Sequence, residues 1–532
     1  MRLKKLISMG LVVIMMLALA ACGNSEKSQS TTSGGPTHTK LEKNDGQSET
    51  GTLEKADEDI AEINILFWTL NTVPSELDDV EEAINEITRE KINTEIHLDI
   101  VDMGSYAQQV NLMVSSGEKL DLMVTLPGDT AHFNSMTSQN QLMDITELLE
   151  EYAPELLEIV PKEWLAGTTI DDKIYSVTSY GDKATPLCFV CRTDILEKTG
   201  IDPSTLKTAG DFTKLFAVVK DMEPQINPLT GSNKNVMTTP YMIDADGKFF
   251  SYDGLGEGNN SIIAIMPGDG SKISNRYETD EFRATCDWIN QWYEAGYVDK
   301  DLANKDDTAE SFIKGGTAFG YFKMVSGGSA GAGSMQQAHG YEMTVIELAD
   351  AVINTGVIRK FSWAVPQNAT EPEAAVKFMN LLYTDEDIVN LLTWGIEGQH
   401  YRTMEDGTLD FLEGQDANSC GYYLGDCSAI IGNGFIAKVR SGQSADYRQQ
   451  TLELNQKAQV SEFLGFGIDN TSAENTLTAL TNVVKELRPA LGCGLKGSEG
   501  VQEMIDKLKA ADVDRYIADM QKQLDDWIAA NK

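Results

Sequence analysis

One serine of this sequence lies in a glycine-rich loop whose spacing suggests nucleophilic catalysis. Gly327, Ser329 and Gly331 match the pattern GxSxG, in which a strand-to-helix turn exposes a nucleophilic serine. That turn needs a helix directly after it, and the glycines in this loop disfavour one. A base is also scarce, because the chain has only five histidines, at positions 38, 97, 132, 339 and 400. The pattern therefore does not predict a serine hydrolase.

A second motif has the residue types of a metal site without the spacing. Asp244, Asp246 and Gly247 occur in DADGK, which contains part of a calcium-loop pattern. In the correct register the first ligand of that loop would be Met242, which offers no oxygen, so a turn is the better interpretation. The chain also has no Walker A pattern. We therefore predict no metal, no cofactor and no ATPase machinery.

Six cysteines follow the first one at position 22. Cys188 and Cys191 form a CxxC, but they lie in the apolar run PLCFVCR, which predicts a buried strand rather than a redox site at a helix start. Cys420 and Cys427, in CGYYLGDC, are close enough in sequence for a short disulfide outside the cytoplasm. Whether any cysteines pair is left open by the sequence.

Cys22 itself ends an apolar segment at the start of the chain. Residues 1–5 are basic, and residues 6–21 are apolar with small residues at the end, which is the pattern of a secretory signal. The order Leu19, Ala20, Ala21, Cys22 resembles the lipobox of bacterial lipoproteins. This resemblance implies cleavage before Cys22 and a diacylglyceryl group on its sulfur. Each buried methylene of the lipid contributes about 0.8 kcal/mol, so two acyl chains would hold the protein firmly on a membrane.

The segment after Cys22 and the overall charge restrict the possible partners. Residues 23–58 have almost no large apolar side chain, so they predict a flexible tether. The whole chain of 532 residues has 82 acidic against 43 basic residues and a formal net charge of -39. Nucleic acid and anionic membrane surfaces are therefore excluded as expected ligands. The remaining chain is long enough for two or more compact lobes.

The apolar periodicity after the tether predicts a sheet covered by helices. Residues 63–68 are a short β-branched run, residues 77–92 have apolar positions at helical spacing, and residues 94–102 alternate as a strand. Strand, helix and strand of this length form a βαβ unit of a parallel sheet. The polar stretch SYGDKAT, residues 179–185, lies between two predicted strands and is a candidate hinge to a second lobe. The last seventy residues predict helices.

Several stretches in order carry a resemblance to a known family. INILFW, SSGEKLDLMVTLP, DDKIYSV and IKGGTAFGYFK resemble the family-1 extracellular solute-binding proteins, the sugar-binding group of ABC importers. WGIEGQHY, residues 394–401, and the closing DRYIADMQKQLDDWIAANK are similar to a Gram-positive lipoprotein subset associated with oligosaccharide uptake. The resemblance implies an α/β fold of the type II periplasmic-binding-protein kind, with two α/β lobes, a hinge, a ligand cleft and a helix-rich C-terminus.

The resemblance also implies a division of the chain into segments. They are a signal peptide at 1–21, a lipid-anchored linker at 22–58, the first part of the N-terminal lobe at 59–180, the first part of the C-terminal lobe at 181–315, a return segment to the N-terminal lobe at 316–385, and the rest of the C-terminal lobe with the helix-rich domain at 386–532.

Candidate ligand-binding residues follow from the same resemblance. In open α/β sheets the ligand lies beyond the carboxyl ends of the strands, which points to the loops after INILFW and LDLMVT. Carried over by motif, the candidates are Trp68, Asn71, Thr125, Asp129, Tyr241, Phe322, Lys323, Glu397 and Tyr401. Glu397 is equally open to being a structural partner of a hinge arginine.

The expected protein is therefore a monomeric receptor that is tethered to the extracellular face of the membrane. It captures a carbohydrate, most simply an oligosaccharide, and delivers it to an ABC permease without catalysing a reaction.

Two alternatives remain open. A surface polysaccharide hydrolase or esterase requires paired carboxylates or a Ser/His site in the cleft. A binding protein for peptides or another small solute requires a clamp of charged side chains instead of aromatic walls.

Overall fold

The predicted βαβ unit builds the first of two sheets. The computed structural model describes residues 60–127, 130–256 and 262–531, so Cys22 and the segments 1–21 and 22–58 lie outside the described residues. β1 (Ala61–Thr69) pairs in parallel with β2 (Thr94–Asp102) and with β3 (Leu122–Val124), and α1 (Leu77–Ile92) connects β1 to β2. β16 (Ser362–Ala364) and β6 (Val177–Thr178) extend the sheet in the order β2-β1-β3-β16-β6. The βαβ prediction is confirmed.

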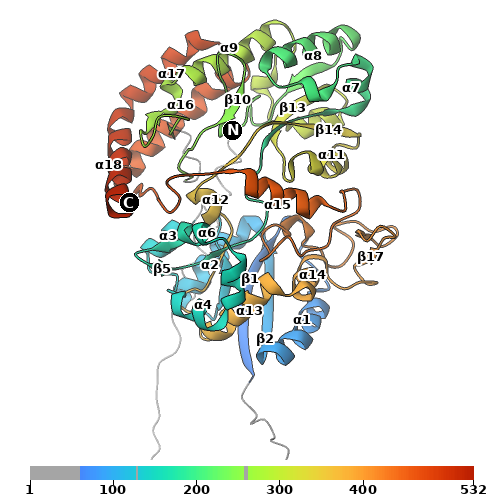
Figure 1. Ribbon diagram of the computed structural model, residues 1–532, viewed down its shortest axis with the longest axis vertical. Coiled ribbons are helices and arrows are strands. Elements are labelled where there is room, and N and C mark those ends of the chain that lie inside the picture. Colours follow the sequence, from blue (N-terminus) through green and yellow to red (C-terminus); the bar gives the residue numbers. More distant parts are fainter. Residues whose placement is uncertain (1–59, 128–129, 257–261, 532) are drawn as a thin grey trace, which may run out of the picture. The chain divides into compact units, whose positions relative to one another are not determined.

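Helices cover this sheet and close the first lobe, at the bottom of Figure 1. The alternating burial along β2, in which every second side chain is enclosed, shows why its apolar residues recur at a spacing of two. The helices of this lobe are α2 (Met103–Ser116), α3 (Phe133–Ser138), α4 (Thr146–Tyr152), α5 (Pro154–Ile159), α6 (Lys162–Gly167), α13 (Pro372–Thr384) and α14 (Glu386–Trp394). A small hairpin, β4 (Thr169–Ile170) with β5 (Lys173–Ile174), lies beside them.

The second lobe is built on a four-stranded sheet with the order β14-β7-β13-β8. Its strands are β7 (Leu187–Arg192), β8 (Asn227–Thr230), β13 (Ala318–Met324) and β14 (Met343–Ala349). β7 is antiparallel to both of its neighbours, and β13 is parallel to β8. Both cysteines of the CxxC are fully buried in β7, so the prediction of a buried strand there is confirmed. Aromatic rings fill the core between this sheet and its helices.

The second lobe also contains shorter elements. They are α7 (Thr193–Thr199), α8 (Ala209–Met222), β9 (Tyr241–Ile243), β10 (Phe249–Ser251), β11 (Ile263–Ala264), β12 (Ser274–Asn275), α9 (Asp280–Glu294), α10 (Ala309–Lys314) and α11 (Ala332–His339). Three C-terminal helices share a second apolar core: α16 (Glu474–Gly492) and α17 (Ser498–Ala510) pack on α9, and α18 (Val513–Asn531) packs on α16 and α17. The prediction of a helical C-terminus is confirmed. No helix within the described ranges is both long and apolar enough to cross a membrane.

Three stretches of chain connect the lobes. Residues 179–185 pass from β6 to β7, as predicted for SYGDKAT. The second stretch contains β15 (Val352–Ile353) and α12 (Thr355–Arg359). The third contains α15 (Tyr447–Lys457) and β19 (Gln459–Val460), and β19 pairs in parallel with β15. Figure 1 shows α15 lying across the middle of this part of the molecule, between the two sheets.

The boundaries between the lobes differ from the predicted ones. We expected the chain to return to the N-terminal lobe at residue 316, but β13 and β14 belong to the second sheet, so the return comes only after Ala349. We also assigned everything after residue 385 to the second lobe, whereas α14 packs on the first lobe, as do the buried residues Tyr422 and Ile431. The reason is that an apolar strand has the same pattern in either sheet, and only long-range pairing decides which sheet it joins.

Candidate functional site

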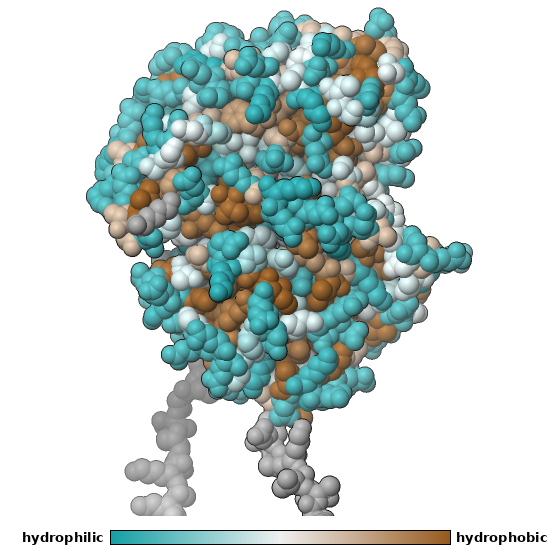
Figure 2. Space-filling view, in the orientation of Figure 1, coloured by the Kyte–Doolittle hydropathy of each residue, from teal (hydrophilic) through white to brown (hydrophobic). Residues whose placement is uncertain are grey.

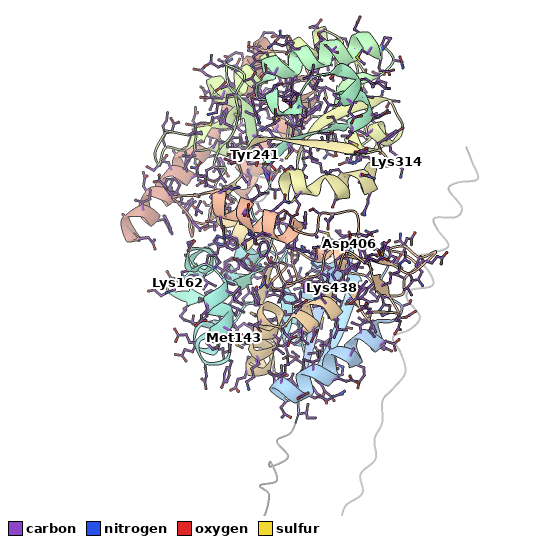
Figure 3. The ribbon with its side chains drawn as sticks, turned by 45° about the vertical axis from the view of Figure 1, so that its right-hand side comes forward. Met143, Lys162, Tyr241, Lys314, Asp406 and Lys438 are labelled. Atoms are coloured by element: carbon purple, nitrogen blue, oxygen red, sulfur yellow. The ribbon has the colours of Figure 1, made fainter. Side chains whose placement is uncertain are left out.

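A cleft of about 480 Å³ lies between the lobes. The first lobe contributes Trp394 at the end of α14 and a loop from 423 to 440, and the second lobe contributes the end of β13 and α11. The connecting stretches form the third side through Asp182 and through Tyr447 and Arg448 of α15. Figure 2 shows hydrophilic side chains gathered over α15 in that view. In Figure 3, Tyr241 lies in the upper lobe and Lys438 in the lower one.

The wall formed by the first lobe combines aromatic rings with hydrogen-bonding groups. The ring of Trp394 lies 5.8 Å from that of Tyr423, and the Tyr423 hydroxyl donates to Asp426 at 3.1 Å. The guanidinium of Arg440 lies 4.5 Å above the Phe411 ring. The indole nitrogen of Trp394 and the Nε of Arg440 are buried without a hydrogen-bond partner among the described residues. Buried donors are normally satisfied, so these two N–H groups are exceptions beside the cleft.

The hinge side of the cleft is built on Asp182. One carboxylate oxygen of Asp182 accepts a hydrogen bond from the hydroxyl of Ser326, which also lies 3.1 Å from the Tyr447 hydroxyl. The other oxygen, Oδ1, is buried and has no partner within the described chain. Burial raises the pKa of Asp182 to about 6, because a charged carboxylate is poorly solvated there. Asp182 therefore connects the first crossing to the end of β13 and keeps one oxygen available.

α15 holds the crossing segment in place. The side-chain oxygen of Asn455 accepts hydrogen bonds from the backbone N–H groups of Lys183 at 3.0 Å and Ala184 at 2.9 Å. The side-chain amide of Asn455 donates to the carbonyl of Gly181 at 2.7 Å. Arg448 of the same helix donates to the carbonyl of Lys438 at 3.3 Å. One helix thus binds both the first crossing and the loop of the first lobe.

The two lobes also touch at the mouth of the cleft. Gln337 of α11 donates to the carbonyl of Ser441 at 2.8 Å, and Gln443 donates to the Ser334 hydroxyl at 2.8 Å. Gly333 lies so close to this loop that an added Cβ would be 1.6 Å from the carbonyl oxygen of Gly442. These contacts depend directly on the angle between the lobes, so opening the cleft must break them.

Two of the predicted residues lie next to the cleft on the first lobe. Asn71 donates to Asp426, a lining residue, at 2.8 Å. Trp68 is buried at the end of β1, stacks on Phe67 with centroids 5.6 Å apart, and has no partner for its indole nitrogen among the described residues. Its carbonyl lies 3.8 Å from the sulfur of Cys427, one residue beyond Asp426. The structure therefore brings Trp68 and Asn71 behind the wall rather than onto its surface.

Three others have their polar or aromatic groups in structural contacts. The Thr125 hydroxyl, fully buried, donates to the carbonyl of Arg359 at 3.1 Å. The Tyr241 hydroxyl donates to the carbonyl of Thr185 at 2.8 Å. Phe322 is part of the aromatic core of the second lobe, with its ring 5.1 Å from that of Phe189. None of the three lines the cleft.

The remaining predicted residues lie away from the lining. Lys323 forms an ion pair with Glu310. Glu397 accepts from the Thr403 hydroxyl and lies 3.8 Å from the Lys438 ammonium, and the Thr403 hydrogen bond lowers the pKa of Glu397. The structure thus pairs Glu397 with a lysine, not with the hinge arginine we considered. Tyr401 is buried, with the Lys438 ammonium 3.3 Å from its hydroxyl. Asp129 lies outside the described residues.

Most of the lining was not predicted from the sequence. The candidates did not include the lining residues Tyr423, Asp426, Phe435, Arg440 and Tyr447. Two of these, Tyr423 and Asp426, belong to the stretch CGYYLGDC, which was considered only for its cysteines. The available signal was the pair of tyrosines beside an aspartate in a loop, which is a polar and aromatic combination without strand or helix periodicity. Asp182 lies in the stretch that we had predicted as a hinge.

The GxSxG loop differs from our expectation in one respect. A helix, α11, does follow it directly. Gly331 and Gly333 serve packing instead, because an added Cβ at either position would collide with a neighbouring backbone carbonyl. The nearby His339 is fully buried, with its Nε2 3.0 Å from the Tyr321 hydroxyl and its Nδ1 at the carbonyl of Met335. Both nitrogens of this imidazole are therefore occupied by structural contacts.

The cysteines of the described chain are all buried and unpaired. The short disulfide between Cys420 and Cys427, which the sequence left open, is not formed: Cys420 points its thiol at the carbonyl of Tyr422, 3.2 Å away, and Cys427 points its thiol at the carbonyl of Trp68. Residues 60–127, 130–256 and 262–531 contain no group of His, Cys, Asp or Glu side chains arranged to hold a metal ion.

The fold is that of solute-binding proteins. The crystal structure of the N-glycan transport solute binding protein from Streptococcus pneumoniae matches 89% of this chain and 100% of that chain, with a TM-score of 0.76 and 21% identity. An alginate-binding protein matches 88% of this chain and 98% of that chain, with a TM-score of 0.55 and 16% identity. Both share the type II arrangement of two α/β lobes that the resemblance implied.

Sequence comparison gives the family. Residues 74–388 match the family described as bacterial extracellular solute-binding protein, and the chain belongs to this family. Residues 462–529, which include the three C-terminal helices, match a domain of unknown function. A carbohydrate ABC transporter substrate-binding protein of Streptococcus pneumoniae serotype 4 is 22% identical over 98% of this chain and 97% of its own length. A polygalacturonan/rhamnogalacturonan-binding protein of Bacillus subtilis is 24% identical over 63% of this chain and 66% of its own length.

Proposed function

We propose that this protein captures an oligosaccharide in the cleft between its lobes and delivers it to the permease of an ABC importer. The observation that carries the proposal is the cleft itself, about 480 Å³ in volume and lined from both lobes and from the hinge. This volume is in the range of about 300–1,000 Å³ that is usual for small-molecule sites. A ligand that touches both lobes stabilises the closed arrangement, which a permease can recognise.

The chemistry of the lining supports a sugar. Trp394 and Tyr423 offer ring faces for the C–H side of a pyranose, and Asp182, Asp426 and Arg440 offer hydrogen-bonding groups for hydroxyls. The lining contains two carboxylates, Asp182 and Asp426, and two guanidinium groups, Arg440 and Arg448, so it is not the one-sided charged clamp that a peptide terminus would need. The names of the relatives refer to N-glycans, alginate and polygalacturonan or rhamnogalacturonan, and they support the same class of ligand.

We also propose that the protein binds without catalysis, as a monomer, and that Cys22 carries the lipid that anchors it to the extracellular face of the membrane. The relatives are named as binding proteins, which supports the absence of chemistry. The order of residues before Cys22 supports lipid attachment. Of the predicted site residues, Asn71 and Trp68 remain the ones we propose to act on the ligand, through Asp426 and the strand end behind it.

A calorimetric screen tests the proposal. The probes are mannose–N-acetylglucosamine oligosaccharides, oligogalacturonides and a mixture of short peptides, and the variant is Asp426→Asn, which keeps the shape of the side chain and removes its charge. Losing one charge-assisted hydrogen bond costs about 1.5–3 kcal/mol, so the variant is expected to bind its glycan roughly 10–100-fold more weakly. Asp506→Asn, on α17, is the matched control and is expected to bind as the wild type does.

Three results would contradict the proposal. Binding of peptides with no glycan bound would favour the peptide alternative. Release of new reducing ends from a bound glycan, measured by chromatography, would favour the hydrolase. Equal weakening by Asp426→Asn and Asp506→Asn would separate glycan binding from this cleft.

A further inference from the structure

A second, much smaller cavity lies inside the second lobe, where α16 packs on it. Its volume is about 30 Å³. Arg276, which begins the short turn before α9, and Arg488, on α16, both line it. No aspartate or glutamate is among the lining residues, which are otherwise apolar, aromatic or neutral polar.

Arg276 is a buried cation with an incomplete set of partners. Its side chain is enclosed, with the residue only 7% exposed. One terminal nitrogen donates to the Tyr252 hydroxyl at 2.8 Å and to the Thr239 hydroxyl at 3.2 Å. Its Nε is buried and has no hydrogen-bond partner among the described residues. Burying a guanidinium is costly unless its donors are satisfied and its charge is balanced.

The surroundings of Arg276 reduce this cost only in part. The ring of Tyr277 lies 4.8 Å from its guanidinium carbon and that of Phe282 lies 5.6 Å away, so aromatic faces stabilise the charge. Those rings accept no hydrogen bond from Nε. No carboxylate in the described part of the chain forms an ion pair with Arg276, although the whole chain has almost twice as many acidic as basic residues.

Arg488 brings a second cation to the same cavity. Its Nε is also buried and also lacks a hydrogen-bond partner in the described ranges. Two arginines from different elements thus line one space whose lining residues carry no negative charge, and each has a buried Nε without a hydrogen-bond partner in the described chain. A water molecule needs about 10–15 Å³ in such a cavity, so the space holds a pair of waters or one small monoatomic anion.

We propose that this cavity binds a single halide-sized anion, such as chloride, between Arg276 and Arg488. A halide can accept hydrogen bonds from both Nε groups and offsets part of their positive charge, whereas water accepts hydrogen bonds without offsetting charge. The acidic surface does not prevent this, because charges more than about 8–10 Å away are screened at physiological salt. Since Arg488 is on α16 and Arg276 precedes α9, the anion would fasten the C-terminal helices to the second lobe.

Two measurements on the full chain test the proposal. The melting temperature is compared in sodium chloride and in sodium gluconate at equal ionic strength, because gluconate is too large for the cavity. We expect the chloride sample to melt roughly 1–3 °C higher, by the usual linkage of ligand binding to stability. The difference is expected to vanish in Arg488→Gln and to persist in Arg515→Gln, an exposed arginine of α18 that serves as the matched control.

Bromide locates the site directly. Crystals of the wild-type protein grown in sodium bromide are expected to show an anomalous peak within hydrogen-bond distance of both Nε atoms. Equal melting temperatures in chloride and gluconate overturn the proposal, as does a difference that persists in Arg488→Gln. A cavity that holds only water in the bromide crystals overturns it as well, and this measurement needs no variant to fold.

Discussion

A buried lysine at the first crossing predicts an unusual dependence of stability on pH. Lys183 is only 7% exposed, and its single side-chain hydrogen bond within the described chain goes to the Ser179 hydroxyl at 3.2 Å. Burial, together with the nearby cation of Lys360, lowers the pKa of Lys183 to about 7, and Asp182 opposes this shift only in part. We expect Lys183→Met to stabilise the protein near neutral pH.

The magnitude follows from the shift. The ordinary pKa of a lysine is 10.5 and the folded value is about 7, and each unit is worth about 1.4 kcal/mol, so the charged side chain costs about 5 kcal/mol below pH 7. For a base whose folded pKa is lowered, the unfolded chain binds more protons between these values, so stability rises with pH from about 7 to 10.5. The remaining cost is about 4 kcal/mol at pH 7.5 and about 2 kcal/mol at pH 9.

The variant removes this cost and one hydrogen bond of about 1 kcal/mol. The free energy of unfolding of Lys183→Met is therefore expected to exceed that of the wild type by about 3 kcal/mol at pH 7.5 and by only about 1 kcal/mol at pH 9. Urea unfolding at the two pH values measures both differences. Lys457→Met, at an exposed position near the end of α15, is the control for loss of one positive charge.

The reasoning is refuted if the stability difference between Lys183→Met and the wild type is the same at pH 7.5 and pH 9, since a group that stays charged throughout would give a constant difference. It is also refuted if Lys457→Met shows the same pH dependence.

Three further predictions concern the second lobe, the contact between lobes and the thiols. Phe322→Ala is expected to lower the free energy of unfolding, measured by urea denaturation, by about 3–5 kcal/mol and to leave glycan affinity unchanged, because the ring packs in the core. Weaker glycan binding at unchanged stability would contradict this prediction. Gly333→Ala places a Cβ on the Gly442 carbonyl and is expected to open the lobes, which X-ray scattering detects as a larger radius of gyration. The control Gly210→Ala, on α8, is expected to leave the radius of gyration unchanged. Identical scattering curves for the two variants would argue against the contact between the lobes. Burial raises the pKa of the Cys286 thiol to about 12 and also raises the pKa of the other five described cysteines. Iodoacetamide at pH 8 is therefore expected to label these thiols only after unfolding, which mass spectrometry can follow. Rapid labelling of the native protein would contradict this expectation.

The predictable parts of the fold were those with local periodicity. The apolar spacing in α1 and the alternation in β2 identified the βαβ unit, and the last seventy residues were predicted to be helical without the number of helices. The polar stretch at 179–185 marked the first crossing, because it interrupts two apolar strands. The position of β13 was not predictable, since it is as apolar as a strand of the first sheet and pairs with β7, more than a hundred residues earlier in the chain.

The site was less predictable than the fold. Phe322 and Trp394 are both aromatic residues at or near the end of an element, and both are almost fully buried. Phe322 packs against the rings of Phe189, Phe212, Phe249 and Trp292 in the second lobe, whereas Trp394 borders the cleft with an indole N–H that has no partner among the described residues. Nothing in the letters around them separates these two environments, so resemblance to a family pointed to some residues that the structure uses for packing.

By itself the sequence determined the strands and helices, the acidic charge and the first crossing, because these depend on neighbours within a few positions. The tertiary structure alone decided which side chains line the cleft. Ser326 meets Asp182, 144 positions earlier in the chain, and Tyr447, 121 positions later. Asn71 donates to Asp426 across 355 positions. Such contacts form only when both lobes and α15 are assembled, since each partner gains its neighbour from the packing of distant elements rather than from local preference.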